Sequence, residues 1–403
     1  MVLDGDFDNA IQVATELSVD LDATVVGVGT SPESRLLRST YCDVGEPVDT
    51  TGDGYAAELL RVVDRHRPDV VVPVGYRSVE AMDGIRGRLP DGVECCLPPS
   101  DAVRAAVDKR RTLSLAADLG IDTPADFSAL ADADRAADAA EDLPFPLFLK
   151  ARHESGENVT AVVDGPQEFR ATYDRLAEAG DDDVLVQEYV GGSNTYACGA
   201  LFLDGEVRTL FEHEERRSIP RQGGSGTRVR VYRDPELEAA AVRILRALDW
   251  HGLALVEFKR RADGSYVLME VNPKLWASYA LASQAGYRFV STMVAETLDL
   301  PWTPPTPDQR REMVFPLREL NFAAGDPDES LPRAALSMLW PPARPDFNLH
   351  DYRAWFTPPA DDEAGDCGAG NDGRPDGEVP EPVPETDGRV APLIARLDPR
   401  RGR

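Results

Sequence analysis

Residues 254–276, ALVEFKRRADGSYVLMEVNPKLW, predict two β-strands that fold back on each other, yet both strands carry acidic residues. The pair Asp263-Gly264 favours a two-residue type I′ turn, a tight connection between antiparallel strands. The register that this turn sets places Glu257 directly opposite Glu270 on one face. Their Cβ atoms would lie ~4.5–5.5 Å apart, where like charges destabilise a sheet. Two acids at these positions therefore need a specific explanation.

An amide side chain joins the two acids. Asn272 lies two residues beyond Glu270 and is therefore expected on the same face of the strand. Two carboxylates and an amide oxygen on largely apolar strands suit a hard divalent cation such as Mg²⁺, which takes oxygen ligands and retains positions for substrate phosphates. The alternative is that these acids face water and that a β-bulge breaks the assumed register. The hairpin alone does not separate the two interpretations.

The charge of the chain is strongly unbalanced. Among 403 residues, 71 Asp and Glu stand against 43 Lys and Arg, which gives a formal net charge of −28 and a pI of about 4.5. Such a composition is typical of proteins in a salt-rich cytoplasm, because salt screens the self-repulsion of an acidic surface. It argues against nucleic acid as a partner, since a phosphate backbone attracts basic surfaces. The hydrophobic content of 42% supports a folded core.

Cysteine use and hydropathy indicate a protein of a reducing, aqueous compartment. The five cysteines form no C-x-x-C pair and are odd in number, so neither a disulfide framework nor a zinc site is expected. The sequence has no run of 18 apolar residues and no recognisable signal peptide. We therefore expect a cytoplasmic protein without a membrane partner.

The first hundred residues alternate between strand and helix patterns. Val-rich runs at 23–30 and 69–75 are typical of buried parallel strands, and residues 8–18 and 54–67 have helical periodicity. This alternation predicts an α/β domain with a parallel sheet at residues 1–100. The chain opens with barely one strand, MVLDGDFDNA, where such a domain normally begins with a longer one. We therefore expect the natural start to lie upstream.

The remainder has the pattern of a mixed α+β region followed by an irregular extension. Strand patterns occur at 145–163, 183–190 and 194–214, and helical patterns at 101–143, 234–249 and 277–299. Asp234 followed by Pro235 marks the start of one of these helices. Residues 301–358 contain Pro and Trp without clear periodicity. Asp, Glu, Gly and Pro dominate residues 359–403, which predicts an acidic disordered tail.

Lysine is scarce in this chain, which has 39 arginines and four lysines: Lys109, Lys150, Lys259 and Lys274. An ammonium group is a compact charge that suits phosphate oxygens. Lys150 ends an apolar strand just before a polar loop, and Lys274 closely follows Asn272, so both are candidates for phosphate contact. For Lys259 we favour no specific function, because it reaches the Glu257 face only if the strand continues undisturbed. The alternative for all four is that they simply escaped replacement by arginine.

A second cluster of charged residues lies at 211–232, FEHEERRSIPRQGGSGTRVRVY. It contains Arg216, Arg217, Arg221 and Arg228 around a Gly-Gly-Ser-Gly turn. Glycines let backbone N–H groups approach an anion, and arginines hold a carboxylate or a phosphate in a bidentate fork. This pattern favours a binding site for an acidic substrate. The alternative is a loop whose arginines pair with the abundant surface acids.

Taken in order and spacing, several motifs resemble the ATP-grasp superfamily, in particular its carboxylate–amine ligases and the ATP-binding domain of the carbamoyl-phosphate synthase large chain. The motifs are DKRRTLSLAADLGIDTP, FPLFLK, VLVQEYV, ALVEF, VLMEVNPKLWAS and ALASQAG, and the match runs to about residue 300. The resemblance implies a pre-ATP-grasp domain at 1–100 and a two-lobed ATP-grasp domain, with subdomain A at 101–185 and subdomain B at 186–300. An extension at 301–358 and the tail at 359–403 follow.

The resemblance also implies roles for individual residues. The implied ATP-binding residues are Lys109 and Lys150 at the phosphates and Gln187, Glu188 and Val190 at the adenine and ribose. The implied ligands of Mg²⁺ (or Mn²⁺) are Glu257, Glu270 and Asn272. The implied catalytic cations, which would stabilise charge developing during transfer, are Arg216, Arg217 and Lys274. The chain departs from the family pattern at three places: a glycine-poor loop after Lys150, Gln187 where an acid is common, and NPK in place of NPR.

These features predict an ATP-dependent ligase that joins a small carboxylic acid to an amine, or less often a thiol, through an acylphosphate. The partners would be small molecules, and a homodimer is common among such proteins. Two alternatives stay open. One is another ATP-grasp chemistry, such as phosphoryl transfer or carboxylation of bicarbonate. The other is a sensor or scaffold that binds ATP without turnover, which the NPK sequence favours and the complete set of metal residues opposes.

Overall fold

The protein is described here from a computed structural model. The structure describes residues 1–49, 54–130, 143–153, 160–179, 183–192, 194–219, 225–325, 329–338 and 343–356, all within one compact unit. The predicted tail at 359–403, the loop glycine Gly156 and Arg221 lie outside the described residues. None of the described helices has the length and apolar content that a membrane crossing requires.

The N-terminal region is a parallel sheet with helices on both faces, as its sequence predicts. β1 (Val26–Gly29) pairs in parallel with β2 (Val44–Pro47), and Val2 forms parallel bridges to both Gly27 and Val72. The opening residues therefore lie between the two Val-rich runs. The helices and helical turns of this region are α1 (Asp8–Leu21), η1 (Leu36–Arg38), α2 (Tyr55–His66), α3 (Tyr76–Ile85) and η2 (Arg86–Arg88). Helix α1 packs on one face of the sheet, and α2 and α3 pack on the other.

A small antiparallel sheet follows. Its strands lie in the order β4-β3-β5, with β3 at Leu147–Ala151, β4 at Thr160–Val163 and β5 at Val184–Glu188. Helix α7 (Pro166–Ala179) covers this sheet through a separate apolar cluster that contains Phe169 and Leu176. The chain reaches it through α4 (Ser100–Val107), α5 (Lys109–Asp118) and η3 (Ser128–Leu130). Of the long helical stretch predicted at 101–143, the structure therefore has two shorter helices, and residues 131–142 are not described.

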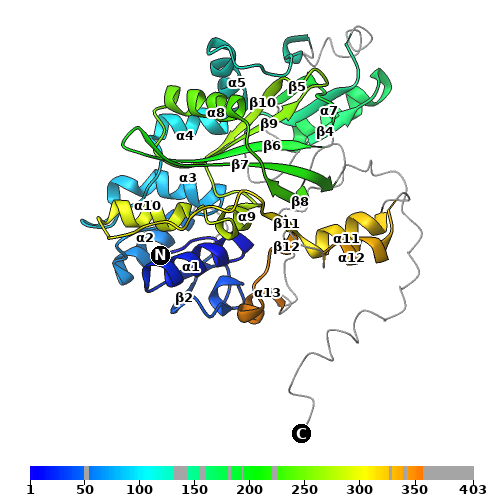
Figure 1. The fold of residues 1–403 in the computed structure, drawn as a ribbon. Coiled ribbons are helices and arrows are strands. Elements are labelled where there is room, and N and C mark those ends of the chain that lie inside the picture. The colour runs from blue at the N-terminus through cyan, green and yellow to red at the C-terminus, as the bar shows by residue number, and fades with distance from the viewer. Residues whose placement is uncertain are drawn as a thin grey trace. The chain divides into compact units, whose positions relative to one another are not determined.

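The central element is a seven-stranded sheet with the order β10-β9-β6-β7-β8-β11-β12. Its bounds are β6 (Thr195–Leu203), β7 (Glu206–Ile219), β8 (Ser225–Val231), β9 (Gly252–Arg260), β10 (Tyr266–Asn272), β11 (Glu312–Val314) and β12 (Ala343–Pro345). Helices α4, α5 and α8 (Pro235–Ala247) lie on one side of this sheet (Figure 1). Asp234 caps α8 by accepting a hydrogen bond from the Glu236 amide, and Pro235 is its first residue, as predicted.

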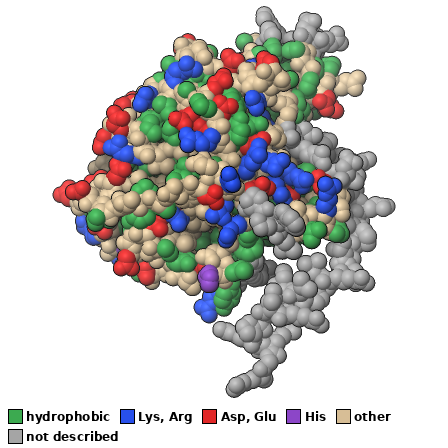
Figure 2. Space-filling model, viewed as in Figure 1, with side chains coloured by type: hydrophobic (Ala, Val, Ile, Leu, Met, Phe, Trp, Pro, Cys, Tyr) green, Lys and Arg blue, Asp and Glu red, His purple; other side chains and the backbone are tan. Residues whose placement is uncertain are grey.

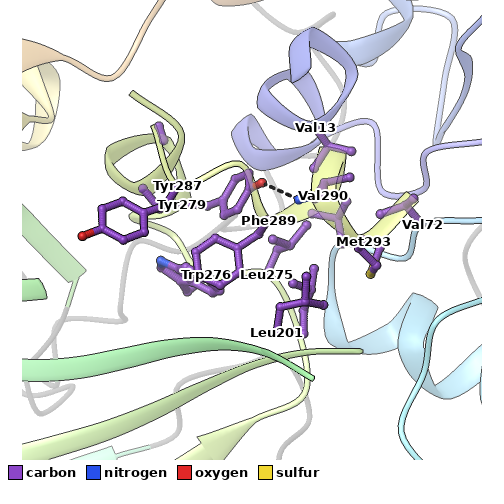
Figure 3. Close-up of a cluster of buried hydrophobic side chains, with 14 of the residues drawn as sticks. Val13, Val72, Leu201, Leu275, Trp276, Tyr279, Tyr287, Phe289, Val290 and Met293 are labelled. Carbon is purple, nitrogen blue, oxygen red and sulfur yellow. Dashed lines mark hydrogen bonds between the residues drawn. The ribbon is translucent and has the colours of Figure 1, made fainter. Parts of the chain in front are cut away.

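The opposite side of the sheet packs against α9 (Tyr279–Gln284), α10 (Phe289–Thr297) and α1. Figure 3 shows this core, in which Trp276, Tyr279 and Phe289 meet above Leu201 of β6. The Val290 amide donates a hydrogen bond to the Tyr279 hydroxyl at 3.2 Å. The sequence predicted one helical segment at 277–299. The structure has two helices instead, because Gly286 adopts a positive φ of 89° between them.

The C-terminal extension takes part in the central sheet. β11 pairs with β8, β12 pairs with β11, and α11 (Pro316–Gly325) and α12 (Leu331–Met338) follow β11. The chain then reaches η5 (Leu349–Asp351) and α13 (Tyr352–Phe356). Asp351 accepts hydrogen bonds from the Ser39 hydroxyl at 2.5 Å and the Thr40 amide at 2.9 Å. The extension therefore closes back onto the N-terminal sheet.

The hairpin β9–β10 confirms one prediction and corrects another. Glu257 pairs with Glu270 across the strands, as predicted. The prediction of a two-residue type I′ turn is wrong. Arg260 pairs with Tyr266, so residues 261–265 form the loop, and among them only Gly264 has a positive φ, at 95°. Asp263 instead accepts hydrogen bonds from the Ser265 amide and hydroxyl, which stabilises a longer loop. A β-bulge between Leu268 and Glu270 then restores the register at the two acids.

Candidate functional site

Two carboxylates and one amide converge where β9 and β10 lie side by side. The Asn272 side-chain nitrogen donates to Glu257 Oε1 at 3.0 Å and to Glu270 Oε1 at 2.9 Å. Asn272 is buried, and both glutamates are half-buried. The bridging amide offsets part of the repulsion between the paired carboxylates. The structure therefore brings all three predicted metal ligands together on one face of the hairpin.

This trio, Glu257, Glu270 and Asn272, has the donor set of a hard-cation site with open positions. Within the described residues no group of three or more His, Cys, Asp or Glu side chains is placed to hold a metal ion. The trio has only two acids, and its third oxygen is an amide oxygen, which a half-turn of the Asn272 side chain would present. A cation held in this way takes its other ligands from water or phosphate. The residues present fit Mg²⁺ bound together with a nucleotide.

Lys150 reaches the same hairpin from the smaller sheet. It is the fourth residue of β3, it is buried, and its Nζ donates to the Met269 carbonyl at 3.2 Å. Met269 lies at the β-bulge, directly before Glu270. The bulge therefore turns a backbone oxygen towards β3 and brings the Lys150 ammonium close to the metal trio. Of the four lysines, Lys150 has the geometry expected for contact with a phosphate beside a cation.

Lys109 is the first residue of α5 and is buried. The preceding residue, Asp108, caps this helix by accepting from the Arg110 and Arg111 amides. Arg152 donates to both Asp108 carboxylate oxygens, at 2.9 and 2.7 Å. Partial burial raises the pKa of Asp108, but the hydrogen bonds and charge of Arg152 outweigh it and hold that pKa below its usual value. The ion pair fixes the end of β3 to the start of the helix that carries Lys109.

The predicted adenine-binding strand is β5 and the residues just after it. Gln187 is completely buried, and neither its amide nitrogen nor its amide oxygen has a hydrogen-bond partner among the residues that the structure describes. Unsatisfied buried amides are costly, and one donor and one acceptor side by side match the edge of an adenine ring. Glu188 instead pairs with Arg261 at 2.8 Å and accepts from the Ala125 amide. Val190 is buried.

Lys259 lies on β9 close to Glu257, although the sequence analysis assigns it no specific function. β9 continues without interruption to Arg260, so Lys259 shares the face of Glu257. Lys259 is buried, and within the described part of the chain its Nζ has no hydrogen-bond partner. Burial lowers its pKa, against the opposing influence of Glu215 and Glu257. Burial raises the pKa of Glu215 to about 7. In the sequence, the two-residue spacing of Glu257 and Lys259 on one strand is the signal that places Lys259 on the same face as Glu257.

The three predicted catalytic cations do not lie together. Lys274 lines a small cavity against Val72 and Pro73 of the N-terminal sheet, two residues after Asn272. Arg217 lies on β7, three strand spacings or about 14 Å of sheet away from β10. Its guanidinium pairs with Glu319 at 2.9 Å, and Arg216 is exposed. Lys274 therefore lies only two residues along the chain from Asn272, whereas β6 and β9 lie between the strand of the two arginines and β10.

Comparison with known sequences finds similarity to an ATP-binding domain and to two kinds of enzyme. The family model described as "Carbamoyl-phosphate synthase L chain, ATP binding domain" matches residues 228–301. The carbamoyl phosphate synthase large chain of Gemmatimonas aurantiaca is 26% identical over 237 residues, which cover 57% of this chain and 21% of that protein. The D-alanine–D-alanine ligase of Stutzerimonas stutzeri is 27% identical over 245 residues, which cover 56% of this chain and 74% of that protein.

Solved structures show the same fold at lower identity. The biotin carboxylase of Campylobacter jejuni, in complex with β-γ-ATP, aligns with a TM-score of 0.62 at 14% identity over 77% of this chain and 72% of that chain. The N5-carboxyaminoimidazole ribonucleotide synthetase of Thermus thermophilus aligns with a TM-score of 0.58 at 20% identity. The alignment covers 80% of this chain and 86% of that chain. The likeness extends over about three quarters of the chain.

These findings define the class of protein. The chain is similar to proteins of the ATP-grasp superfamily. Within this superfamily it is similar to the ATP-binding domain of carbamoyl phosphate synthase large chains and to D-alanine–D-alanine ligases. The match covers about a fifth of the length of the first of these relatives and about three quarters of the second.

Proposed function

We propose that this protein is an ATP- and Mg²⁺-dependent ligase that joins a small carboxylic acid to an amine or a thiol. A carboxylate oxygen of the acid attacks the γ-phosphorus of ATP, the bond to ADP breaks, and an acylphosphate forms. The amine nitrogen then attacks the acyl carbon, phosphate leaves, and the nitrogen loses a proton. The observation that carries the proposal is the trio Glu257, Glu270 and Asn272 beside Lys150.

The residues of this chain would act mainly by positioning and by charge. We propose that Lys109 and Lys150 hold the phosphates and that Gln187, Glu188 and Val190 line the adenine and ribose site, with Glu188 contributing its backbone. Mg²⁺ or Mn²⁺ bound by the trio would neutralise the phosphate oxygens during transfer. The two unsatisfied side-chain atoms of Gln187 support the adenine assignment, because a bound base would satisfy both.

We propose that Lys274 and Lys259 stabilise the negative charge that develops on the transferred phosphoryl group. Lys259 is supported by its buried, unpartnered Nζ on the face of Glu257. We do not assign Arg216 and Arg217 to the transferred phosphoryl group, because β7, which carries Arg217, lies three strand spacings, or about 14 Å, from β10. They would balance the charge of an acidic ligand at a distance from the reacting phosphate.

The wider assignments rest on the same resemblance. We propose domains at 1–100, 101–185 and 186–300 with an extension at 301–358, a cytoplasmic location, and a homodimer. A dimer is described for a related biotin carboxylase domain from Hydrogenobacter thermophilus. The solved structures with this fold include carboxylases, so carboxylation by the same site is the second candidate.

Release of ADP in molar KCl with Mg²⁺ tests the proposal. Pools of amino acids and small carboxylic acids would be screened with and without amines, and with bicarbonate in a separate arm. We expect turnover that needs one acid and is absent in Glu270→Gln. Turnover that needs bicarbonate alone would establish the carboxylase instead. ATP binding without stimulated turnover in any arm would contradict an enzyme and support a sensor.

A further inference from the structure

A pocket lined by four arginines lies between the hairpin β7–β8 and helix α12. Its volume is about 230 Å³. The lining residues are Arg216, Arg217, Arg228, Glu329, Arg333, Ala334 and Ser337. Figure 2 shows basic side chains gathered on this part of the surface, over β8, α11 and α12. Such a concentration is unusual in a chain with a net charge of −28.

Two of the four arginines are fixed by acids of the extension. Arg217 pairs with Glu319 at 2.9 Å and with Glu329 at 3.2 Å. Arg228 pairs with Glu312 at 3.0 Å and donates to the Ser337 hydroxyl at 2.7 Å. These contacts hold the two guanidinium groups in defined positions. They form the rigid wall of the pocket.

The other two arginines have no such partner. Neither Arg216 nor Arg333 makes a hydrogen bond or an ion pair with any residue that the structure describes. In addition, Arg228 Nε is buried and has no hydrogen-bond partner in the described ranges. A buried N–H group of a guanidinium without an acceptor is costly, and an anion in the pocket would supply one.

Among the residues that the structure describes, the charges around the pocket leave an excess of one positive charge. Four arginines face three acids, namely Glu312, Glu319 and Glu329. Arg216 and Arg333 are the two lining arginines that no described acid pairs with. A single carboxylate would neutralise the excess charge, and a phosphate would also suit the several guanidinium donors.

The pocket is separate from the proposed metal site. Arg228 and Arg230 alternate with Val229 on β8 and share one face of the sheet. Arg230 pairs with Glu214, which also accepts from Tyr196 on the side of α8. Glu257 pairs in register with Ala197 and therefore faces the other side. Along the sheet, β8 lies three strand spacings, or about 14 Å, from β9, which carries Glu257, and β7 lies two spacings, or about 10 Å, from it.

We infer that this pocket is a second binding site, which takes the phosphate or carboxylate group of a small molecule between β7–β8 and α12. Arg333 and Arg216 supply the unpaired charges, and Arg228 supplies the unsatisfied N–H. The ligand joins the catalytic sheet to the C-terminal extension. Arg216 and Arg217 are the arginines assigned above to an acidic ligand, but anion binding in this pocket can be measured without the proposed ligase reaction.

Anion titration of the full-length protein tests this inference. Inorganic phosphate and malonate would be added separately at constant ionic strength, without nucleotide, and binding followed by calorimetry and by the unfolding temperature. We expect saturable binding of one or both anions. Arg333→Gln should weaken it by ~10-fold or more, the effect of losing one charge-assisted hydrogen bond. Arg333 is chosen because its removal leaves no buried acid without a partner.

Two controls separate this pocket from the proposed nucleotide site. Arg246→Gln removes an equally exposed positive charge from α8 and should leave binding unchanged. Lys150→Met alters the proposed ATP phosphate site and should also leave the Arg333-dependent binding unchanged. A preference for phosphate or for malonate identifies the chemistry of the bound group. No saturable binding, or equal binding by wild type and Arg333→Gln, overturns the inference whether or not the protein is a ligase.

Discussion

Glu257 and Glu270 lie directly opposite each other on adjacent antiparallel strands, and the Asn272 amide donates a hydrogen bond to both. Two like charges in this position lower the stability of a sheet. The arrangement is therefore kept at a cost in the metal-free protein. A cation between the carboxylates would convert the repulsion into attraction, which is the physical basis of the proposed function.

Removal of one of these charges should stabilise the protein without a metal. Glu257→Gln keeps the size of the side chain and removes the repulsion, so we expect the free energy of unfolding in EDTA to rise by ~0.2–1 kcal/mol. Addition of Mg²⁺ and ADP should stabilise the wild type and fail to stabilise the variant. Denaturant unfolding measures both effects. A variant that is less stable in EDTA and equally stabilised by Mg²⁺ would contradict the assignment.

Lys150 should contribute to ATP affinity more than to stability. Its Nζ donates to the Met269 carbonyl beside Glu270, and Lys150→Met keeps the aliphatic chain while removing the charge. We expect ATP binding to weaken by ~10-fold or more, with partial recovery in Lys150→Arg. Calorimetry with ATP and Mg²⁺ measures the change. Arg246→Met serves as the control for loss of a positive charge, and an equal loss of affinity there would argue against a direct contact.

Glu319 should be a major source of stability for the C-terminal extension. Its side chain is fully buried, accepts from the Thr227 hydroxyl at 2.8 Å, and pairs with Arg217. Glu319→Gln removes a buried charge whose partner Arg217 is 34% exposed and still pairs with Glu329, so it should lower the free energy of unfolding by ~1–3 kcal/mol. Asp101→Asn, which breaks an exposed pair with Arg104, should change it by less than ~1 kcal/mol. Similar effects of the two substitutions in denaturant unfolding would contradict the structure.

His213 should make stability depend on pH below neutrality. Burial lowers its pKa to about 3 from an ordinary value of 6.5, and its Nε2 lies 2.9 Å from the Ser278 hydroxyl. The unfolded chain binds a proton at this residue below pH 6.5 and the folded protein does not, so stability falls as pH decreases. Relative to His213→Gln, the wild type should lose ~1.4 kcal/mol per pH unit below about pH 6. The exposed His350→Gln should follow the wild type, and parallel curves for all three proteins would contradict a buried neutral imidazole.

The turns of this protein show what its sequence could and could not predict. Two Asp-Gly pairs occur between strands, and both favour a type I′ turn. Asp204-Gly205 forms it, with positive φ at both residues, whereas Asp263 keeps a negative φ and bonds to Ser265. The residue after the glycine differs, Glu206 in the first case and Ser265 in the second, and only the Ser265 hydroxyl donates a hydrogen bond to the aspartate of its turn. The bulge at Met269, which restores the pairing of the acids, has no local signal.

Long-range contacts were the other limit of the sequence analysis. The alternation of strand and helix predicted the N-terminal sheet, and Asp234-Pro235 predicted the start of α8, because both signals are local. The sequence analysis missed that β11 and β12 extend one edge of the central sheet, because strands of three residues carry too little periodicity. The contribution of Arg333 to the arginine pocket was also missed. Arg333 and Arg216 are far apart in the sequence and line one pocket only because of the way α12 packs.

The measurement that tests the central claim most directly is cation binding by the trio. Mn²⁺ would be titrated into the protein with ADP in molar KCl, and free Mn²⁺ followed by electron paramagnetic resonance. We expect the wild type and the exposed control Glu206→Gln to bind Mn²⁺ equally. Glu257→Gln and Glu270→Gln should each weaken binding by ~10-fold or more. Equal affinity in all four proteins would contradict a metal site on this hairpin and, with it, the proposed ATP-dependent reaction.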